Sequence, residues 1–225
     1  AFYGPDSSTE GADPATASRD VAELIRRLDR EQHIKGLVLD LRRNGGGLLN
    51  EAVSLAGLFL PNGGPVVQVR DHEGNVKVDS AKEVPPLWAG PLTALVDRFS
   101  ASASEIVAGA LQDHKRATLV GTRSFGKGSV QTIVPLGGNG ALRLTTARYY
   151  TPSGRSIQAK GIAPDILVMP DVPPELKGRD ETKGEASLRG HLKNGEDEGG
   201  GSSAYVPPDP KNDKQLKHSN VPKHT

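Results

Sequence analysis

The apolar positions near the start of the chain follow the period of a helix. After Ser18, four apolar residues recur at helical spacing, namely Val21, Leu24, Ile25 and Leu28. A serine just before such a run is a typical helix cap, because its hydroxyl accepts from a free backbone N–H group. The pattern therefore predicts an amphipathic helix capped by Ser18.

A strand, a glycine turn and a second helix are predicted next. Residues 34–41 form a short, continuous apolar run with β-branched side chains, typical of a strand buried on both faces. The Asn-Gly-Gly-Gly run at 44–47 ends it. Helical spacing returns over 48–60 and stops at the Pro and Gly residues of 61–65.

The remaining apolar pattern alternates between strands and one more helix. Strands are predicted at 66–69, 76–78, 91–96, 117–120, 129–135 and 141–150, and a helix at 102–112. The segments 71–75 and 137–140 read as hairpin turns because they are polar and contain glycine. Strands that alternate with helices predict a layered α/β fold.

The pattern fails after residue 170. Residues 178–203 consist mainly of Gly, Glu, Lys, Asp and Ser, which cannot bury enough apolar surface to offset the entropy of the chain. We therefore expect a core at 1–170 and a polar, mostly disordered or loosely attached tail at 171–225.

Composition narrows the classes of function. The net charge of +1 gives no support for a nucleic-acid partner. The absence of cysteine excludes disulfides, a thiol nucleophile and cysteine-ligated zinc. No apolar run approaches the roughly 18 residues that a membrane helix needs, and no signal peptide is visible. We expect a fragment whose export signal and other modules lie upstream.

A serine cluster and a lysine carry the candidate chemistry. Ser100, Ser102 and Ser104 lie at the predicted start of the 102–112 helix, and Lys127 follows Ser102 by 25 residues between two glycines. Each serine has a structural interpretation as cap or packing residue, and the lysine has one as a solvated loop residue. As a pair, however, they provide a nucleophile and a base, which a serine hydroxyl needs beside it.

Histidine is the usual base, and none of the six is well placed. Residues Ser102 and His114 at opposite ends of one helix would be about 18 Å apart. His33 and His72 lie at a helix end and in a hairpin, and the other three lie in the polar tail. A lysine can replace histidine if burial lowers its pKa from about 10.4 towards 7–8.

Supporting groups can be named for the pair. Residues 127, 129 and 131 share a face if this segment is extended, so Gln131 is expected to orient Lys127. With Ser102 as nucleophile, the Ala103 amide at the helix N-terminus would stabilise an oxyanion. The glycine amides at 45–47 are further donors, unless they form only a turn.

One motif is misleading. Residues 121–128 nearly match the phosphate-binding loop G-x-x-x-x-G-K-[ST] and follow a predicted strand. Glycine stands where the Mg²⁺-binding hydroxyl belongs, and the next segment is β-type rather than helical. We therefore do not expect this chain to be a nucleoside triphosphatase.

Five motifs resemble those of the carboxy-terminal processing, or tail-specific, serine peptidases of bacterial type. They are LVLDLRRNGGG at 37–47, VDRFSASASEI at 96–106, SFGKGSVQ at 124–131, RYYTPSG at 148–154 and KGIAPDI at 160–166. Their order and spacing agree over residues 1–170.

The resemblance implies roles for individual residues. It implies Ser102 as nucleophile, Lys127 as base and Gln131 as the residue that orients the lysine. The resemblance implies that the oxyanion donors are the amide of Ala103 and a glycine amide of the 45–47 run, with Gly47 as the first choice and Gly46 beside it. Asp113 matches a position that is structural in relatives. No metal, nucleotide or other cofactor is implied.

The resemblance also implies a fold and a setting. The fold would be the ClpP/crotonase-like β/α spiral core. The protein would be periplasmic or exported, associated with a membrane if its N-terminal segment provides the anchor. It would cleave proteins near unstructured, apolar C-termini, and a second copy or an adaptor would be its other partners.

Two departures leave alternatives open. Family members carry an upstream PDZ domain that captures the substrate, whereas we expect only the catalytic core here. The ending at 218–225 is polar, where an apolar helix is expected, so a truncated or altered terminus is anticipated. A catalytically incompetent fragment or scaffold, and a crotonase-type acyl-CoA enzyme with the same fold, remain the alternatives to a Ser-Lys peptidase.

Overall fold

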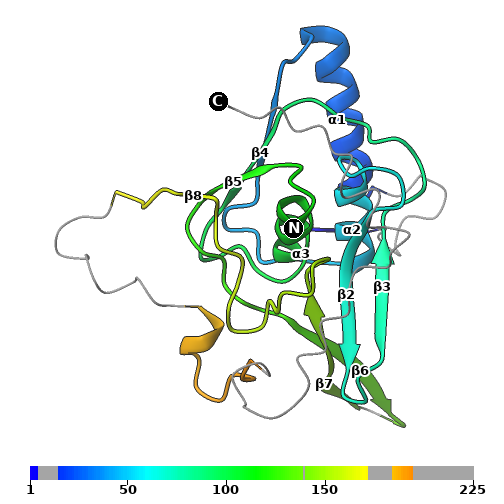
Figure 1. Ribbon diagram of the computed structural model, residues 1–225. Coiled ribbons are helices and arrows are strands. Elements are labelled where there is room, and N and C mark those ends of the chain that lie inside the picture. Colours follow the sequence, from blue (N-terminus) through cyan, green and yellow to red (C-terminus); the bar gives the residue numbers. More distant parts are fainter. Residues whose placement is uncertain (5–14, 139, 172–183, 195–225) are drawn as a thin grey trace.

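The computed structural model describes residues 1–4, 15–138, 140–171 and 184–194 (Figure 1). This part of the chain is a mixed α/β fold with two four-stranded sheets. Most of the predicted tail, and with it the anticipated altered terminus, lies outside the described residues. The layered α/β prediction is confirmed.

The first sheet is parallel and has the strand order β1-β4-β5-β8. Its strands are β1 (Leu37–Asp40), β4 (Leu92–Val96), β5 (Thr118–Gly121) and β8 (Ile166–Leu167). The prediction that the first strand is buried on both faces is wrong. The burial alternates along β1, so that Val38, at 65% exposed, lies with Asp40 on a face that the described residues leave open.

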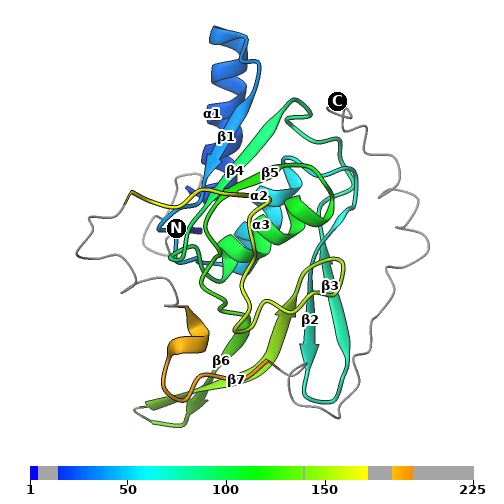
Figure 2. The same cartoon turned by 60° about the vertical axis from the view of Figure 1, so that its left-hand side comes forward.

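The second sheet is antiparallel and has the order β3-β2-β7-β6. Its strands are β2 (Pro65–Asp71), β3 (Val76–Ser80), β6 (Ser129–Leu136) and β7 (Gly140–Tyr150). The β6–β7 hairpin extends away from the body of the molecule, and most of its side chains are exposed (Figure 2).

The helices are α1 (Ala17–Gln32), α2 (Leu49–Gly57) and α3 (Ala103–Asp113). Helix α3 lies between the sheets, in contact with β5 of one and β2 of the other, and packs against α2 (Figure 2). All of residues 103–111 are buried. Small side chains permit this close packing: a Cβ on Gly109 would lie 2.8 Å from Thr151.

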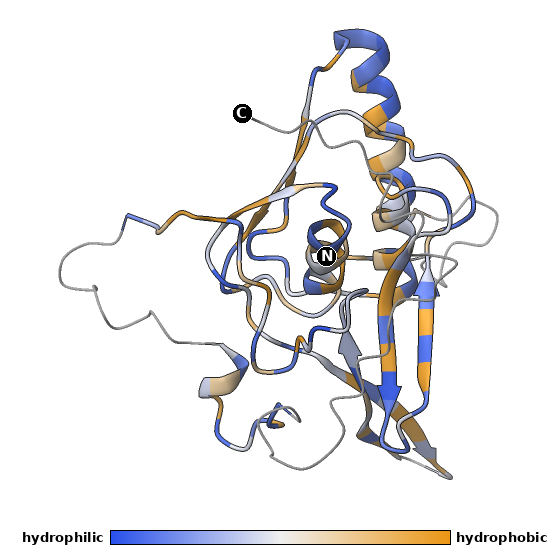
Figure 3. Ribbon diagram, viewed as in Figure 1, coloured by the Kyte–Doolittle hydropathy of each residue, from blue (hydrophilic) through white to orange (hydrophobic). Residues whose placement is uncertain are grey.

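Helix α1 begins earlier than predicted and is capped by a different residue. The hydroxyl of Thr16 accepts from the Arg19 amide, so the assignment of Ser18 as cap is wrong. Ser18 instead donates through its amide and its hydroxyl to the buried carboxylate of Glu51. Only the inner part of the predicted apolar stripe is covered, and polar and apolar residues alternate along the protruding helix (Figure 3).

Residues 184–194 form a short segment that includes a 3₁₀ turn, η2 (Glu185–Ser187). This segment hydrogen-bonds to the core at Phe125 and Gln158, so it is an attached part of the predicted tail.

Two negative findings apply to the described residues alone. None of their helices has both the length and the apolar character needed to cross a membrane. They contain no group of three or more His, Asp or Glu side chains that could hold a metal ion.

The buried His114 makes the stability of the fold depend on pH. Its Nε2 lies 2.7 Å from the Pro65 carbonyl oxygen, and burial lowers the pKa of the imidazole below its usual value. The unfolded chain, with a histidine pKa near 6.5, therefore takes up a proton first as the pH falls. The contribution is fully present above about pH 6.5 and is lost as the pH falls towards the folded-state pKa.

We expect urea unfolding to give a lower free energy of unfolding at about pH 5 than at about pH 7.5. His114→Gln should keep the hydrogen bond to the Pro65 carbonyl and reduce this difference. The exposed His72→Gln should leave it unchanged. An equal pH dependence in wild type and His114→Gln would contradict the assignment.

Candidate functional site

Three loops that carry predicted site residues follow three neighbouring parallel strands. The loop with Gly46 and Gly47 follows β1, the loop with Ser102 follows β4, and the loop with Lys127 follows β5. Because the carboxyl ends of parallel strands meet at one edge of a sheet, the topology brings these segments together. This edge is the candidate active site.

Ser102 occupies the N-cap of α3 in an unusual backbone conformation. Its φ is 57° and its ψ is −115°, a region that side-chain-bearing residues rarely adopt. Such strain costs on the order of 1–3 kcal/mol and concentrates at functional sites. At the start of the helix, the Ala103 amide has no hydrogen-bond partner among the described residues.

The neighbouring serines have structural partners. The hydroxyl of Ser100 donates to the Leu41 carbonyl at 2.8 Å, and the hydroxyl of Ser104 donates to the Asn44 carbonyl at 2.7 Å. These bonds fasten the Ser102 loop to the β1 loop. Among the three candidate serines, Ser102 is therefore left as the nucleophile candidate.

The buried carboxylate of Glu105 joins the Ser102 loop to the Lys127 loop. One oxygen, Oε2, accepts from the amides of Ser102 and Lys127, each at 2.8 Å. The other, Oε1, accepts from the Ser124 hydroxyl and the Gly126 amide, each at 2.6 Å. Glu105 is 0% exposed, so these four donors replace its contact with water.

Burial raises the pKa of the Glu105 carboxyl, and the four hydrogen bonds lower it in part. A protonated carboxyl group would need an acceptor for its own O–H. Three of the four partners are backbone N–H groups, which can only donate. The site is thus arranged around an ionised carboxylate. Sequence reasoning missed this residue, although Ser102 and Glu105 have the spacing of a capping box, which was the available signal.

The glycines around Lys127 permit close packing against residues 157–161. A Cβ on Gly128 would lie 2.4 Å from the backbone nitrogen of Gln158, and one on Gly126 would lie 3.2 Å from the backbone of Ala159. Gly126 also has a φ of 95°. Glycine at both positions permits this close approach. The segment after this loop is a strand, β6, as the argument against a phosphate-binding loop required.

The glycine run lies against the Ser102 loop. A Cβ on Gly46 would lie 2.9 Å from the Ser102 Cβ and 3.0 Å from the Ala103 nitrogen. The Gly46 amide donates to the Asn44 side chain at 3.1 Å, whereas the Gly47 amide has no partner among the described residues. On the other side, Gly47 packs against the backbone of Phe2.

The side chains of the candidate residues are not joined. In the part of the chain that the structure describes, the Lys127 ammonium has no hydrogen bond or ion pair, with Ser102 or any other residue. Gln131 is exposed on β6, and its amide nitrogen donates to the Thr145 hydroxyl at 2.9 Å. The sheet register shifts between Val130 and Gln131. The role of Gln131 stays a prediction.

Asp113 has the structural role expected of it. Its carboxylate accepts from the Ser153 amide at 2.8 Å and forms an ion pair with Arg155. It therefore fixes the loop after β7 to the end of α3.

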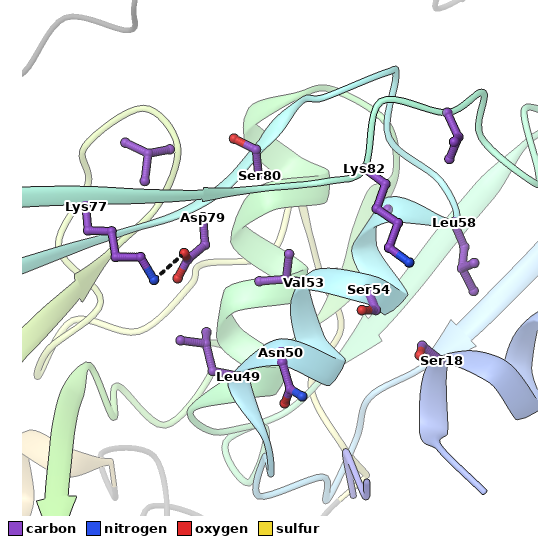
Figure 4. Close-up of a pocket in the computed structure, with 13 residues that line it drawn as sticks. Ser18, Leu49, Asn50, Val53, Ser54, Leu58, Lys77, Asp79, Ser80 and Lys82 are labelled. Carbon is purple, nitrogen blue, oxygen red and sulfur yellow. Dashed lines mark ion pairs between the residues drawn. The ribbon is translucent and has the colours of Figure 1, made fainter. Parts of the chain in front are cut away.

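A separate pocket of about 790 Å³ lies between α2 and β3 (Figure 4). Leu49 and Val53 of α2 face it, and the Lys77–Asp79 ion pair lies on its β3 side. None of the predicted site residues lines this pocket.

Comparison with curated proteins identifies similar chains. This chain is 58% identical over 186 residues to a protein named carboxy-terminal-processing protease from Bartonella bacilliformis, covering 81% of this chain and 43% of that protein. It is 42% identical over 157 residues to a tail-specific protease from Haemophilus influenzae, and this match covers 66% of this chain and 22% of that protein. The chain thus spans less than half the length of these relatives.

A solved structure agrees with these matches. The photosystem II D1 C-terminal processing protease superimposes with a TM-score of 0.62 at 38% identity, covering 73% of this chain and 42% of that one. The family model that matches is described as peptidase family S41 and aligns with residues 7–168. On this evidence, the chain belongs to peptidase family S41, the carboxy-terminal processing serine proteases.

Proposed function

We propose that this chain is the catalytic core of an endopeptidase with a Ser102–Lys127 dyad. The observation that carries the proposal is the shared Glu105 oxygen, which accepts from the amides of both residues. Two amides bound to one oxygen atom lie close together, so the backbones of the nucleophile and the base are held side by side.

In the proposed reaction, the uncharged Lys127 amine takes the proton of the Ser102 hydroxyl as Oγ bonds to the scissile carbonyl carbon. The Ala103 and Gly47 amides hold the oxyanion, which is consistent with both lacking a partner among the described residues. Gly46 supports this cradle by its close contact with Ser102. As the tetrahedral intermediate collapses, the C–N bond breaks and the leaving amine takes the proton from Lys127.

Water then completes the reaction. It gives a proton to Lys127 as its oxygen attacks the acyl carbon, and Ser102 is released when the ester bond breaks and recovers the proton. Before the first step, the Lys127 side chain must turn towards Ser102. Because the backbone of Lys127 is fixed to Glu105, we expect this movement to occur by rotation about side-chain bonds. Gln131 would orient the lysine once it has turned.

We infer that the substrates are proteins cleaved at or near unstructured, apolar C-terminal regions. The names of the relatives, carboxy-terminal-processing protease and tail-specific protease, support this class. The proposal includes an exported or periplasmic location, with a second copy of the chain or an adaptor as further partners. No cofactor takes part.

The dyad predicts that Ser102→Ala and Lys127→Ala each reduce cleavage by at least about a thousandfold. The assay follows release of the tail from a folded reporter protein that carries an unstructured, apolar C-terminal extension. Ser54→Ala and Lys35→Ala, both exposed and remote from the three loops, are matched controls that should retain activity. Wild-type turnover in either dyad variant would exclude the dyad, and an inactive unmodified chain would favour the scaffold alternative.

A lysine base also predicts a pH dependence. Only the uncharged amine can accept a proton, so kcat should fall as the pH is lowered from about 9 to about 5. The His114→Gln variant should show the same profile, which separates this effect from the pH-dependent stability. A flat profile over this range would argue against a lysine base.

Glu105→Gln should reduce kcat by roughly tenfold or more. The amide group cannot accept all four hydrogen bonds, so at least one loop loses its anchor, with a stability cost of about 1–3 kcal/mol. Glu51→Gln is the matched control: Glu51 is also buried, and its carboxylate accepts from Ser18, remote from Ser102. Glu51→Gln should lower the free energy of unfolding. Its kcat should stay unchanged when measured at a temperature at which the variant is fully folded. Equal kcat losses in both variants would reduce Glu105 to a purely structural residue.

A further inference from the structure

The segment 184–194, here called the C-terminal strap, contacts both sides of the Lys127 loop. On one side, the Glu185 amide donates to the Phe125 carbonyl at 2.8 Å. Gly184 lies so close to this carbonyl that a Cβ would be 2.6 Å from its oxygen. The strap therefore packs directly against the residue two positions before Lys127.

On the other side, the strap acts through Gln158. The Gln158 side chain is 0% exposed, and its oxygen accepts from the Gly128 amide at 3.0 Å. Its nitrogen donates to the Leu192 carbonyl at 2.8 Å and to the Glu185 carboxylate at 3.3 Å. One buried amide thus joins the residue after Lys127 to the strap.

Asn194 completes the connection. It is buried although it lies in a polar segment, and its amide nitrogen donates to the Gln158 carbonyl oxygen at 2.8 Å. The Gln158 side chain is therefore oriented by Leu192 and Glu185, and the Gln158 backbone carbonyl is held by the Asn194 side chain. With Glu105 bound to Gly126 and Lys127, hydrogen bonds hold the loop from two directions.

We propose that Gln158 is a positioning residue for Lys127 and that the C-terminal strap holds it in place. The strap fixes the backbone on both sides of the lysine, which limits the orientations that its side chain samples. The catalytic consequence rests on the proposed dyad, whereas the effect on loop order does not. Loss of the strap contacts should loosen residues 125–128 while leaving substrate binding unaffected.

Hydrogen exchange of the full chain tests the effect on loop order. In Asn194→Ala, amide exchange of peptides covering 124–131 should become roughly threefold to tenfold faster, as expected from the loss of one hydrogen bond. Peptides from α3 should be unchanged, which shows that the variant is folded. Lys193→Ala, exposed and next in sequence, is the matched control. Unchanged exchange at 124–131 in Asn194→Ala would overturn the proposal, whatever the activity.

A side-chain exchange tests the role of Gln158 itself. Gln158→Glu keeps the acceptor for Gly128 but turns a carboxylate towards the Leu192 carbonyl and Glu185, so the strap side becomes repulsive. We expect kcat on the tailed reporter to fall roughly threefold to tenfold at unchanged KM. Adding Glu185→Gln restores a donor opposite the new carboxylate and should recover part of kcat.

The two possible failures are distinguishable. If Lys127→Ala retains wild-type turnover, the dyad is wrong, and the exchange data still decide whether the strap orders the loop. If Lys127→Ala is inactive while Gln158→Glu keeps wild-type kcat, the dyad stands and Gln158 is not a positioning residue. An increase in KM alone would assign the strap to substrate binding and would also overturn the proposal.

Discussion

The site depends on one buried carboxylate. Removing an ionised carboxylate from water costs several kcal/mol unless donors replace the water, and Glu105 receives four. Three of these donors are backbone amides on two different loops, so the need to satisfy one charge fixes the relative position of both loops. The strained backbone of Ser102 is held by the same contact, because its amide is one of the donors. A neutral side chain in this place could not impose the same geometry.

The sheet delivers the loops to this carboxylate. Strands β1, β4 and β5 are parallel neighbours, so the segments that follow them emerge at one edge. Small residues then permit the final approach: Gly46 lies against Ser102, and Gly128 lies against Gln158. The fold supplies proximity to within a few ångströms, and the buried polar contacts of Ser100, Ser104 and Glu105 fix the remaining geometry.

The sequence was sufficient to predict most of the helices and strands, though not β8 or η2, and to name candidate residues, because apolar periodicity and motif spacing are local signals. It was insufficient wherever a tertiary contact decided the outcome. The apolar run of β1 does not reveal that one face of the strand is left uncovered, so the exposure of Val38 was not foreseen. Ser18 has the composition of a helix cap, yet a distant partner, Glu51, takes its hydroxyl. The strap was missed since its composition is that of a solvated linker, and its attachment rests on single buried amides, Gln158 and Asn194, which leave no periodic pattern.

The contrast between fixed backbones and an unpaired lysine side chain has a consequence for control. The amides of Ser102 and Lys127 share one oxygen atom, so the backbones of the two residues are held close together, while no hydrogen bond or ion pair among the described residues fixes the Lys127 side chain. In the proposed dyad, the unpaired state and the reactive pair differ by the energies of the Lys127 side-chain rotamers and by the cost of desolvating the amine. Small changes around the loop can alter both quantities. The strap touches this loop at Phe125, two residues before the lysine, and, through Gln158, at Gly128, the residue after it. A contact that shifts the strap would therefore act first on the backbone around the lysine, whereas the Ser102–Glu105 unit is also fastened to the β1 loop by Ser104.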